Sequence, residues 1–296
     1  MNSPSAIINK ILTFSAVDGP GNRLVVFFQG CNLACLNCHN PYTMGRCNDC
    51  GDCIPHCPQQ ALSMDDTGTV RWDADLCSQC DTCLSVCTFS ASPKTLRYSV
   101  SELLDVVQDN TPFISGITLS GGEATTQLPF ILAFLTALRT NPATAALSCL
   151  VDSNGLLGKT AWQQLLPLVD GVMLDIKAWH TDQHKAITGS HNHRVKASLD
   201  QLIRSKKLAE LRFLLIPSVT DFDPPPDDLL LMLRGLSPET PIRINGFQHH
   251  GVVGAAAFWP PAQSDDISRF QQVLHSAGLL NVKIPVHTEK MSLPFR

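Results

Sequence analysis

Residues Arg23 to Pro41 read RLVVFFQGCNLACLNCHNP, an apolar run that ends at a glycine and is followed at once by three cysteines. The apolar part, Arg23 to Gln29, is bounded by glycines and has the length and composition of a buried β-strand. Cys31, Cys35 and Cys38 follow it in a Cys-x3-Cys-x2-Cys pattern. This stretch therefore predicts a strand that leads directly into a set of closely spaced thiols.

From about residue 98 onward, apolar strand candidates alternate with stretches of helical periodicity. The expected helices span 99–109, 127–140, 158–168, 195–209, 225–235 and 264–277. The expected strands span 116–119, 146–151, 171–176, 211–216 and 241–247, with a last strand at 281–286. Such alternation is typical of βα units around a parallel sheet. With the first strand there are about six units, fewer than a closed eightfold barrel needs. We therefore predict an α/β fold, a partial (β/α)6 barrel of the TIM type, with a doubly wound sheet as the competing architecture.

The composition excludes several classes of protein. The chain has 296 residues, a net charge of −4, 44% hydrophobic and 16% charged residues, which indicates a globular core and not a disordered tail. It contains no apolar run of membrane-spanning length, and Met1 to Ser5 lack the basic and apolar parts of a signal peptide. The near-neutral charge gives no support for nucleic-acid binding. We expect a cytoplasmic protein that binds neither membrane nor nucleic acid.

Cysteine is the unusual residue. Eleven of the 12 cysteines lie between Cys31 and Cys87. Without a secretory signal, this density favours metal ligation in a reducing compartment over disulfides. The remaining one, Cys149, lies in an apolar stretch and is expected to be a small buried side chain.

Eight of these cysteines form a repeat of two runs, each with the spacing Cys-x2-Cys-x2-Cys-x3-Cys. This is the spacing of the bacterial ferredoxin run, in which the fourth cysteine of each run ligates the neighbouring [4Fe–4S] cluster. One predicted cluster site therefore consists of Cys47, Cys50, Cys53 and Cys87, and the other of Cys77, Cys80, Cys83 and Cys57. Thr88 replaces the proline that usually follows the last cysteine. A pair of zinc sites is the alternative. We expect a ferredoxin-like domain at residues 46–89, inserted in a barrel domain of residues 1–45 and 90–296.

The first three cysteines have no nearby fourth partner. Three thiolates on a [4Fe–4S] cube leave one iron open to an external ligand, as a catalytic metal site keeps one position open. The alternative is that Cys47 completes this set, although Cys47 is already required by its own quartet.

Polar groups follow or lie near the end of each predicted strand, where functional groups of βα barrels collect. Beyond the triad these are Ser120-Gly121-Gly122-Glu123, Asp152-Ser153-Asn154-Gly155, Asp175-Ile176-Lys177 and His249-His250-Gly251, and the strand expected at 211–216 carries Arg212 near its start. Each signal has an ordinary structural explanation when taken singly. The first two motifs are also turn sequences, Met173 is also a typical core residue, and the charged residues are also typical of solvated ion pairs. His56 and the histidines outside this set are expected at the surface.

The triad after the first strand resembles that of the radical S-adenosylmethionine (SAM) enzymes. The sequence Asp18-Gly19-Pro20-Gly21-Asn22-Arg23, together with Gly30-Cys31 and Cys38-His39-Asn40-Pro41, resembles the glycyl-radical-enzyme activating enzymes more narrowly. The resemblance runs from Asp18 to about Gly251, and the two quartets are similar to an insertion in larger members. The match is closest to the YjjW-type subgroup. Asn22 and Ala124 depart from the residues that are commoner in the family.

This resemblance implies roles for the strand-end residues. Gly121, Gly122 and Glu123 match the stretch that meets the methionyl amino group of SAM, and Asn154 belongs to the same SAM-binding set. A monovalent cation beside the SAM carboxylate is implied at Asp152, Ser153, Met173 and Asp175, whose oxygens suit a hard cation. The carboxylate and ribose of SAM would pair with Lys177, Arg212 and His250, although His249 is adjacent to His250.

The resemblance also implies an oxidoreductase activity. Reductive cleavage of SAM would give a 5′-deoxyadenosyl radical that abstracts an α-hydrogen from one glycine of a partner glycyl radical enzyme. No side chain need act as an acid or base, because the cofactors carry the chemistry. Flavodoxin or ferredoxin would donate electrons through the two additional clusters. The alternatives are a ferredoxin-type electron-transfer protein and a radical SAM enzyme that acts on another substrate.

Overall fold

The computed structural model describes residues 4–284. Its main sheet has nine strands in the order β11-β10-β9-β8-β7-β6-β2-β1-β5. The bounds of these strands are β1 Ser5–Ser15, β2 Arg23–Phe28, β5 Leu96–Ser99, β6 Gly116–Gly121, β7 Ser148–Ser153, β8 Gly171–Ile176, β9 Leu208–Leu215, β10 Ile242–Gly246 and β11 Val282–Lys283. The strands from β2 through β11 pair in parallel, whereas β1 is antiparallel to both β2 and β5. The chain therefore has an α/β fold built on a parallel sheet.

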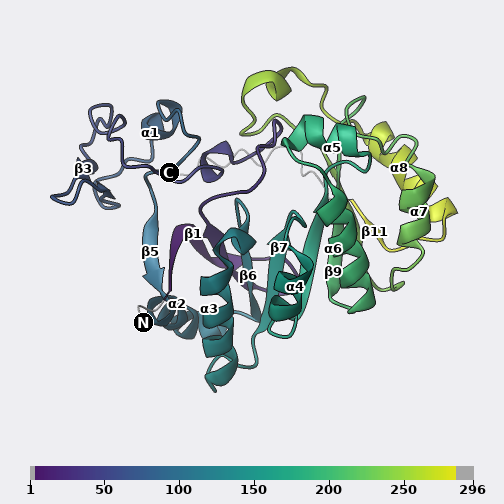
Figure 1. Ribbon diagram of the computed structural model, residues 1–296, viewed down its shortest axis with the longest axis horizontal. Coiled ribbons are helices and arrows are strands. Elements are labelled where there is room, and N and C mark those ends of the chain that lie inside the picture. Colours follow the sequence, from purple (N-terminus) through teal and green to yellow (C-terminus); the bar gives the residue numbers. More distant parts are fainter. Residues whose placement is uncertain (1–3, 285–296) are drawn as a thin grey trace.

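Helices connect the parallel strands. Their bounds are α2 Val100–Asn110, α3 Leu128–Thr140, α4 Lys159–Leu165, α5 Thr181–Thr188, α6 His193–Arg204, α7 Asp227–Leu233 and α8 Ser264–Ser276. Short 3-10 turns occur at η1 Pro41–Thr43, η2 Thr111–Phe113, η3 Ala124–Gln127 and η4 Gly254–Phe258. Figure 1 shows α2, α3, α4 and α6 side by side in front of the sheet. Among residues 4–284, no helix is both long and apolar enough to cross a membrane.

Local sequence explains where these elements begin and what they bury. In α2, the Ser99 side chain accepts from the Glu102 backbone N–H and the Glu102 side chain accepts from the Ser99 backbone N–H, a capping box. α3 carries a proline in its first turn and buries Phe130, Phe134 and Leu138 against the core. Burial of such side chains is the main driving force for packing helices on the sheet.

The predicted strands and helices all have counterparts, with shifted ends. The helix expected at 195–209 was predicted too long, because α6 ends at Arg204 and Leu208 already belongs to β9. Arg212 consequently lies inside β9 and not near its start. Of the strand expected at 281–286, β11 covers Val282–Lys283, and residues 285–286 lie outside the described part of the chain.

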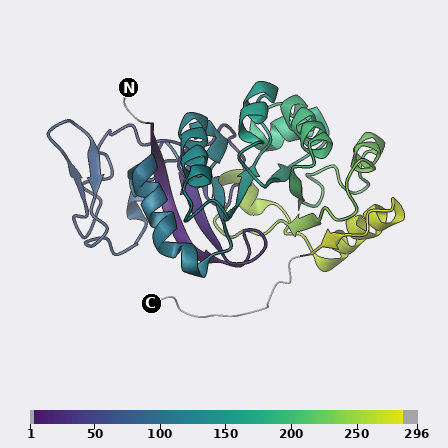
Figure 2. The same cartoon turned by 90° about the horizontal axis from the view of Figure 1, so that it is seen from below.

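Between β2 and β5 the chain forms a separate, turn-rich segment. It contains the two-stranded sheet of β3 (Leu62–Met64) and β4 (Val70–Trp72) and the short helix α1 (Thr82–Ser85). Figures 1 and 2 place this segment at one end of the molecule, with α7 and α8 at the other.

The two cysteine runs repeat in backbone conformation as well as in sequence. Left-handed backbone occurs at three pairs of equivalent positions, which are Asp49 and Gln79, Gly51 and Asp81, and Gln60 and Ser90. Residues other than glycine rarely adopt a left-handed backbone, so its recurrence at matched positions indicates that the two runs share one local fold. The internal repeat is therefore structural.

Candidate active site and cofactor-binding cavities

A cavity of about 410 Å³, the triad cavity, lies at the carboxyl ends of the parallel strands. Its walls come from the residues that follow β2 and from the ends of β6, β7, β8, β9 and β10. Eleven of the residues singled out in the sequence line it: Cys31, Cys35, Cys38, Gly121, Gly122, Glu123, Asp152, Ser153, Asn154, Asp175 and Lys177. The strand-end signals thus converge on one space, as expected for a parallel βα sheet.

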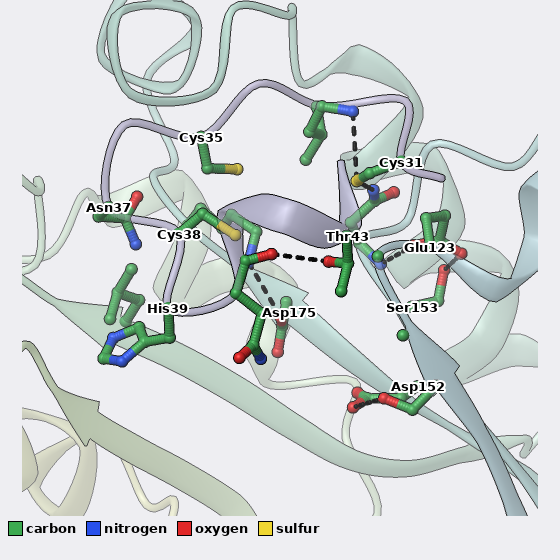
Figure 3. A pocket seen from close by; sticks show the side chains of 18 of the residues that line it. Cys31, Cys35, Asn37, Cys38, His39, Thr43, Glu123, Asp152, Ser153 and Asp175 are labelled. Carbon is green, nitrogen blue, oxygen red and sulfur yellow. Dashed lines mark hydrogen bonds and ion pairs between the residues drawn. The ribbon is translucent and has the colours of Figure 1, made fainter. Parts of the chain in front are cut away.

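The three thiols of the triad belong to one loop. Figure 3 shows the side chains of Cys31, Cys35 and Cys38 directed toward a common space inside this loop. Two backbone contacts anchor it to α5, because Ala34 N donates to Thr188 O (3.0 Å) and Leu36 N donates to Ile187 O (2.9 Å). The loop geometry is therefore imposed by an element that lies more than 140 residues further along the chain.

Burial has a direct effect on these thiols. It raises the pKa of Cys31 to about 12 and also raises the pKa of Cys35 and of Cys38. Three half-buried thiols at one cavity wall fit an iron–sulfur cluster, because bound iron compensates the negative charge that burial disfavours.

Glu123 is the most constrained of the strand-end residues. Its side chain is almost fully enclosed, with 2% exposure. Its carboxylate accepts from Asn154 N (2.7 Å), Ser153 Oγ (3.1 Å) and Thr125 Oγ1 (2.5 Å). Burial raises the pKa of Glu123, and these hydrogen bonds oppose that change. The residue therefore ties the end of β6 to the end of β7 and fixes this part of the cavity wall.

Asp152 has a cationic partner within the protein. Its Oδ1 lies 2.9 Å from Arg212 Nη1, and its Oδ2 accepts from Ser120 Oγ at 3.1 Å. Burial raises the pKa of Asp152, and Asp175 adds to this, whereas Arg212 opposes it. Arg212 Nη2 also lies 3.0 Å from Met173 Sδ. Arg212 and Met173 do not line the triad cavity, but Arg212 contacts it indirectly through its ion pair with Asp152.

Asp175 is paired with Lys177, whose Nζ lies 3.0 Å from Asp175 Oδ2. Burial alone would lower the pKa of Lys177, but Asp175 and the nearby Cys35 and Cys31 raise it. The ammonium group is therefore positively charged at the cavity wall. Arg212 and Lys177 therefore reduce the mutual repulsion of the two aspartates.

The histidines differ from the prediction. His249 and His250 are both exposed and do not line the cavity. Gly251, the next residue, packs so closely on His39 that a Cβ there would lie 2.1 Å from His39 O. His39 itself lines the cavity and His184 is buried with 1% exposure, so the prediction of surface positions was wrong for both. Burial lowers the pKa of each ring.

Asn37 also lines the cavity although its sequence position was not singled out. It is 4% exposed, and its Oδ1 has no hydrogen-bond partner within the described residues. Its place inside the triad, between Cys35 and Cys38, was an available signal, as was the position of His39 directly after Cys38.

The eight remaining clustered cysteines divide between two smaller cavities. The Trp72 cavity is lined by Cys57, Cys77, Cys80 and Cys83, and the Phe89 cavity by Cys47, Cys50, Cys53 and Cys87. This division crosses the two sequence runs in the way that ferredoxin spacing predicts. Within residues 4–284, no three His, Cys, Asp or Glu side chains gather as ligands of a single metal ion. Each set of four thiols instead lines a cavity.

None of the 12 cysteines, which all lie within the described residues, forms a disulfide. Cys149 is fully buried among core residues, as predicted.

Comparisons with known proteins agree with an iron–sulfur site at the triad cavity. The family model of a 4Fe-4S single cluster domain matches residues 17–196. The isethionate sulfite-lyase activating enzyme of Oleidesulfovibrio alaskensis is 32% identical over 254 residues, which cover 78% of this chain and 79% of the relative. The pyruvate formate-lyase-activating enzyme of Streptococcus mutans is 30% identical over 221 residues, 74% of this chain and 68% of the relative.

A solved structure supports the fold. The crystal structure of QueE from Escherichia coli matches with a TM-score of 0.54 over 96% of this chain and 95% of that chain, at 14% identity. By its sequence relatives and its cluster domain, the chain belongs to the glycyl-radical-enzyme activating enzymes of the radical SAM superfamily.

Proposed function

We propose that this chain activates a glycyl radical enzyme with a [4Fe–4S] cluster held by Cys31, Cys35 and Cys38 and with SAM bound in the triad cavity. The observation that carries the proposal is the convergence of the three thiols and three strand-end motifs on one cavity. When bound, the cluster and SAM supply a 5′-deoxyadenosyl radical that takes a hydrogen atom from a glycine α-carbon of the partner.

In this proposal, the residues of the chain bind and orient SAM and shield the radical from water. Lys177 places a positive charge at the wall, which suits the carboxylate of SAM. A Cβ at Gly121 would lie 2.2 Å from Phe28 O, and one at Gly122 would lie 2.6 Å from Gly30 O, so glycine at both positions lets this turn pack against the end of β2 and the start of the triad loop. Glu123 holds this turn against the end of β7. SAM bound between the strand ends and the triad loop would displace water from this cavity, which would protect a reactive radical.

The architecture is part of the proposal. Residues 1–45 and 90–296 would form a partial (β/α)6 barrel, and residues 46–89 a ferredoxin-like insert with two further [4Fe–4S] clusters. The six parallel strands from β2 to β10 support the first statement, and the Trp72 and Phe89 cavities support the second. Three clusters per chain follow.

The partner would be a glycyl radical enzyme, and the electron donor flavodoxin or ferredoxin. Relatives are named for activating isethionate sulfite-lyase, choline trimethylamine-lyase and 4-hydroxyphenylacetate decarboxylase. From the sequence resemblance, we place this chain nearest the YjjW-type subgroup. A SAM contact at Asn154, and a monovalent cation near Asp152, Ser153, Met173 and Asp175, complete the proposed site.

Anaerobic reconstitution tests the proposal. The whole chain should bind about 12 iron atoms, four for each of three clusters. It should release 5′-deoxyadenosine from SAM under reducing conditions, and it should produce a glycyl radical, detected by electron paramagnetic resonance, on a glycyl radical enzyme supplied as the partner.

Cysteine variants supply the matched comparison. Replacing Cys31, Cys35 and Cys38 by alanine should remove about four iron atoms and all SAM cleavage. Cys149→Ala removes a buried thiol outside the three cavities and should retain the full iron content. SAM cleavage by the triple variant would overturn the assignment of the triad.

A further inference from the structure

The Trp72 and Phe89 cavities differ in what faces the thiols. The Trp72 cavity is lined by Trp72, Lys94 and Asp81 in addition to its four cysteines. The Phe89 cavity is lined mainly by apolar side chains, including Val70, Val86 and Phe89. Asp52 is its one charged lining residue within the described part of the chain. Two sites with equal thiol sets therefore have unequal surroundings.

Trp72 presents an unused hydrogen-bond donor. It is the last residue of β4 and pairs with the buried Leu62 across the two-stranded sheet. Its indole Nε1 is enclosed and has no partner among residues 4–284. A buried donor without an acceptor is costly and calls for an explanation, such as a group that the cavity receives. The sulfur atoms of a cluster held by the surrounding thiols are acceptors of this kind.

Lys94 adds a positive charge to the same cavity. Its side chain is 12% exposed, and its Nζ forms an ion pair with Asp81 and donates to Gln79 Oε1 at 3.1 Å. The Asp81 side chain is 61% exposed. Water screens the aspartate more than the lysine, so the pair leaves a net positive field on the buried side.

We propose that Trp72 and Lys94 set the potential of the cluster in the Trp72 cavity above that of the cluster in the Phe89 cavity. The inference rests on the three-cluster part of the proposed function. A cluster that takes one electron from its donor gains one negative charge. An N–H donor and a cation stabilise that reduced form, and hydrogen bonds to sulfur and local charge are among the factors that set cluster potentials. The cluster beside Trp72 is then the one reduced first.

A potentiometric titration of the reconstituted chain, followed by electron paramagnetic resonance, tests this. The wild type should show two different midpoint potentials for its additional clusters. Cys80→Ala should abolish the higher one and thereby assign it to the Trp72 cavity. Trp72→Phe keeps an aromatic ring without the N–H, and Lys94→Gln removes the charge. Each should lower the higher midpoint and leave the other in place.

Arg71→Gln is the matched control. Arg71 precedes Trp72 on β4, but its side chain is 61% exposed and pairs with Asp65. Loss of this screened charge should move neither midpoint. If Trp72→Phe retains less iron than the wild type, the midpoint potentials of Lys94→Gln alone decide the test.

Two failures are distinguishable. An iron content near 12 per chain with unmoved midpoints in Trp72→Phe and Lys94→Gln would overturn this inference only, as would loss of the lower midpoint in Cys80→Ala. An iron content near four per chain would overturn the three-cluster proposal and the inference with it.

Discussion

Each acidic side chain at the carboxyl edge of the sheet is compensated by the protein. Asp152 pairs with Arg212, Asp175 pairs with Lys177, and Glu123 accepts hydrogen bonds from its neighbours. Such compensation lets charged groups remain at a cavity wall that is largely withdrawn from water. The cavity can thus present Lys177 and the strand-end oxygens to a zwitterionic ligand at fixed positions.

Asp175→Asn tests the proposed monovalent cation. If the ion sits beside Asp175 and the SAM carboxylate, the variant should bind SAM more weakly by about 2–5 kcal/mol. Wild-type SAM cleavage should be faster in potassium or sodium than in lithium salts, and the variant should lose this dependence. Cleavage across alkali salts at constant ionic strength measures both effects.

Asp170→Asn is the control for this experiment. Asp170 directly precedes β8, at the end opposite Asp175, and pairs with Arg139. Its replacement should leave the alkali-ion dependence intact. A flat response to alkali ions in the wild type would mean that Arg212 and Lys177 alone neutralise the two aspartates.

Glu123→Gln tests the constraint on the cavity wall. The carboxamide replaces one acceptor oxygen by a donor, so Asn154 N or the hydroxyls of Ser153 and Thr125 lose their acceptor. An unsatisfied buried group should reduce the free energy of unfolding by about 1–3 kcal/mol, measured by urea denaturation of the metal-free protein. Glu102→Gln, at the exposed cap of α2, should cost less. Equal losses in the two variants would count against a special role for Glu123.

At the residue scale, the sequence predicted which side chains meet but not how they pair. The rule that strand ends gather at one edge placed Asp152, Asp175 and Lys177 together. The pairing of Asp152 with Arg212 depends on β9 passing beside β8 in a particular register, with Asp175 opposite Arg212. That register arises from packing across the sheet and has no signature in either segment alone.

Among the elements, β1, β5 and α5 were not predicted. β5 has only four residues, and α5 has the polar sequence TDQHKAIT, so neither carries a strong periodic pattern. Contacts with the rest of the fold, and not a local sequence pattern, determine these two elements. Yet α5 is the element that anchors the triad loop, through the carbonyls of Ile187 and Thr188. The cysteine spacing predicted the three thiols as ligands, whereas the support that orients them comes from a weakly patterned helix.

Gly189→Ala tests the contribution of α5. Gly189 ends α5 in a left-handed conformation with φ of 77°, which alanine adopts at a cost of about 1–2 kcal/mol. Because Thr188 and Ile187 bind the triad loop, distortion here should alter the spectrum of the SAM-binding cluster and weaken its iron retention. The clusters of the other two cavities should be unchanged.

Gly278→Ala separates this effect from a general loss of stability. Gly278 follows α8 with φ of 87°, and an added Cβ would meet open space. The backbone cost is thus similar, but the triad loop is not involved. If both variants affected the SAM-binding cluster alike, α5 would have no specific role in holding the loop.

Across the whole molecule, the three thiol-lined cavities differ in the number of their ligands. The triad cavity supplies three cysteines and a space of about 410 Å³, whereas the other two supply four cysteines each. Two of the eight additional ligands, Cys50 and Cys80, are exposed at the surface. Ligand number, and not burial alone, should therefore determine which cluster is lost first.

Iron release to a chelator under a controlled amount of air measures this order. The cluster of the triad cavity lacks a fourth thiolate, so its open iron is accessible and about one third of the iron should leave in a first phase. SAM fills the same cavity and should slow only that phase. The later phases, which come from the four-thiol sites, should proceed at the same rate with and without SAM. Release of all iron in a single phase that SAM slows uniformly would mean that the three clusters do not differ in this way, and that SAM protects the fold as a whole.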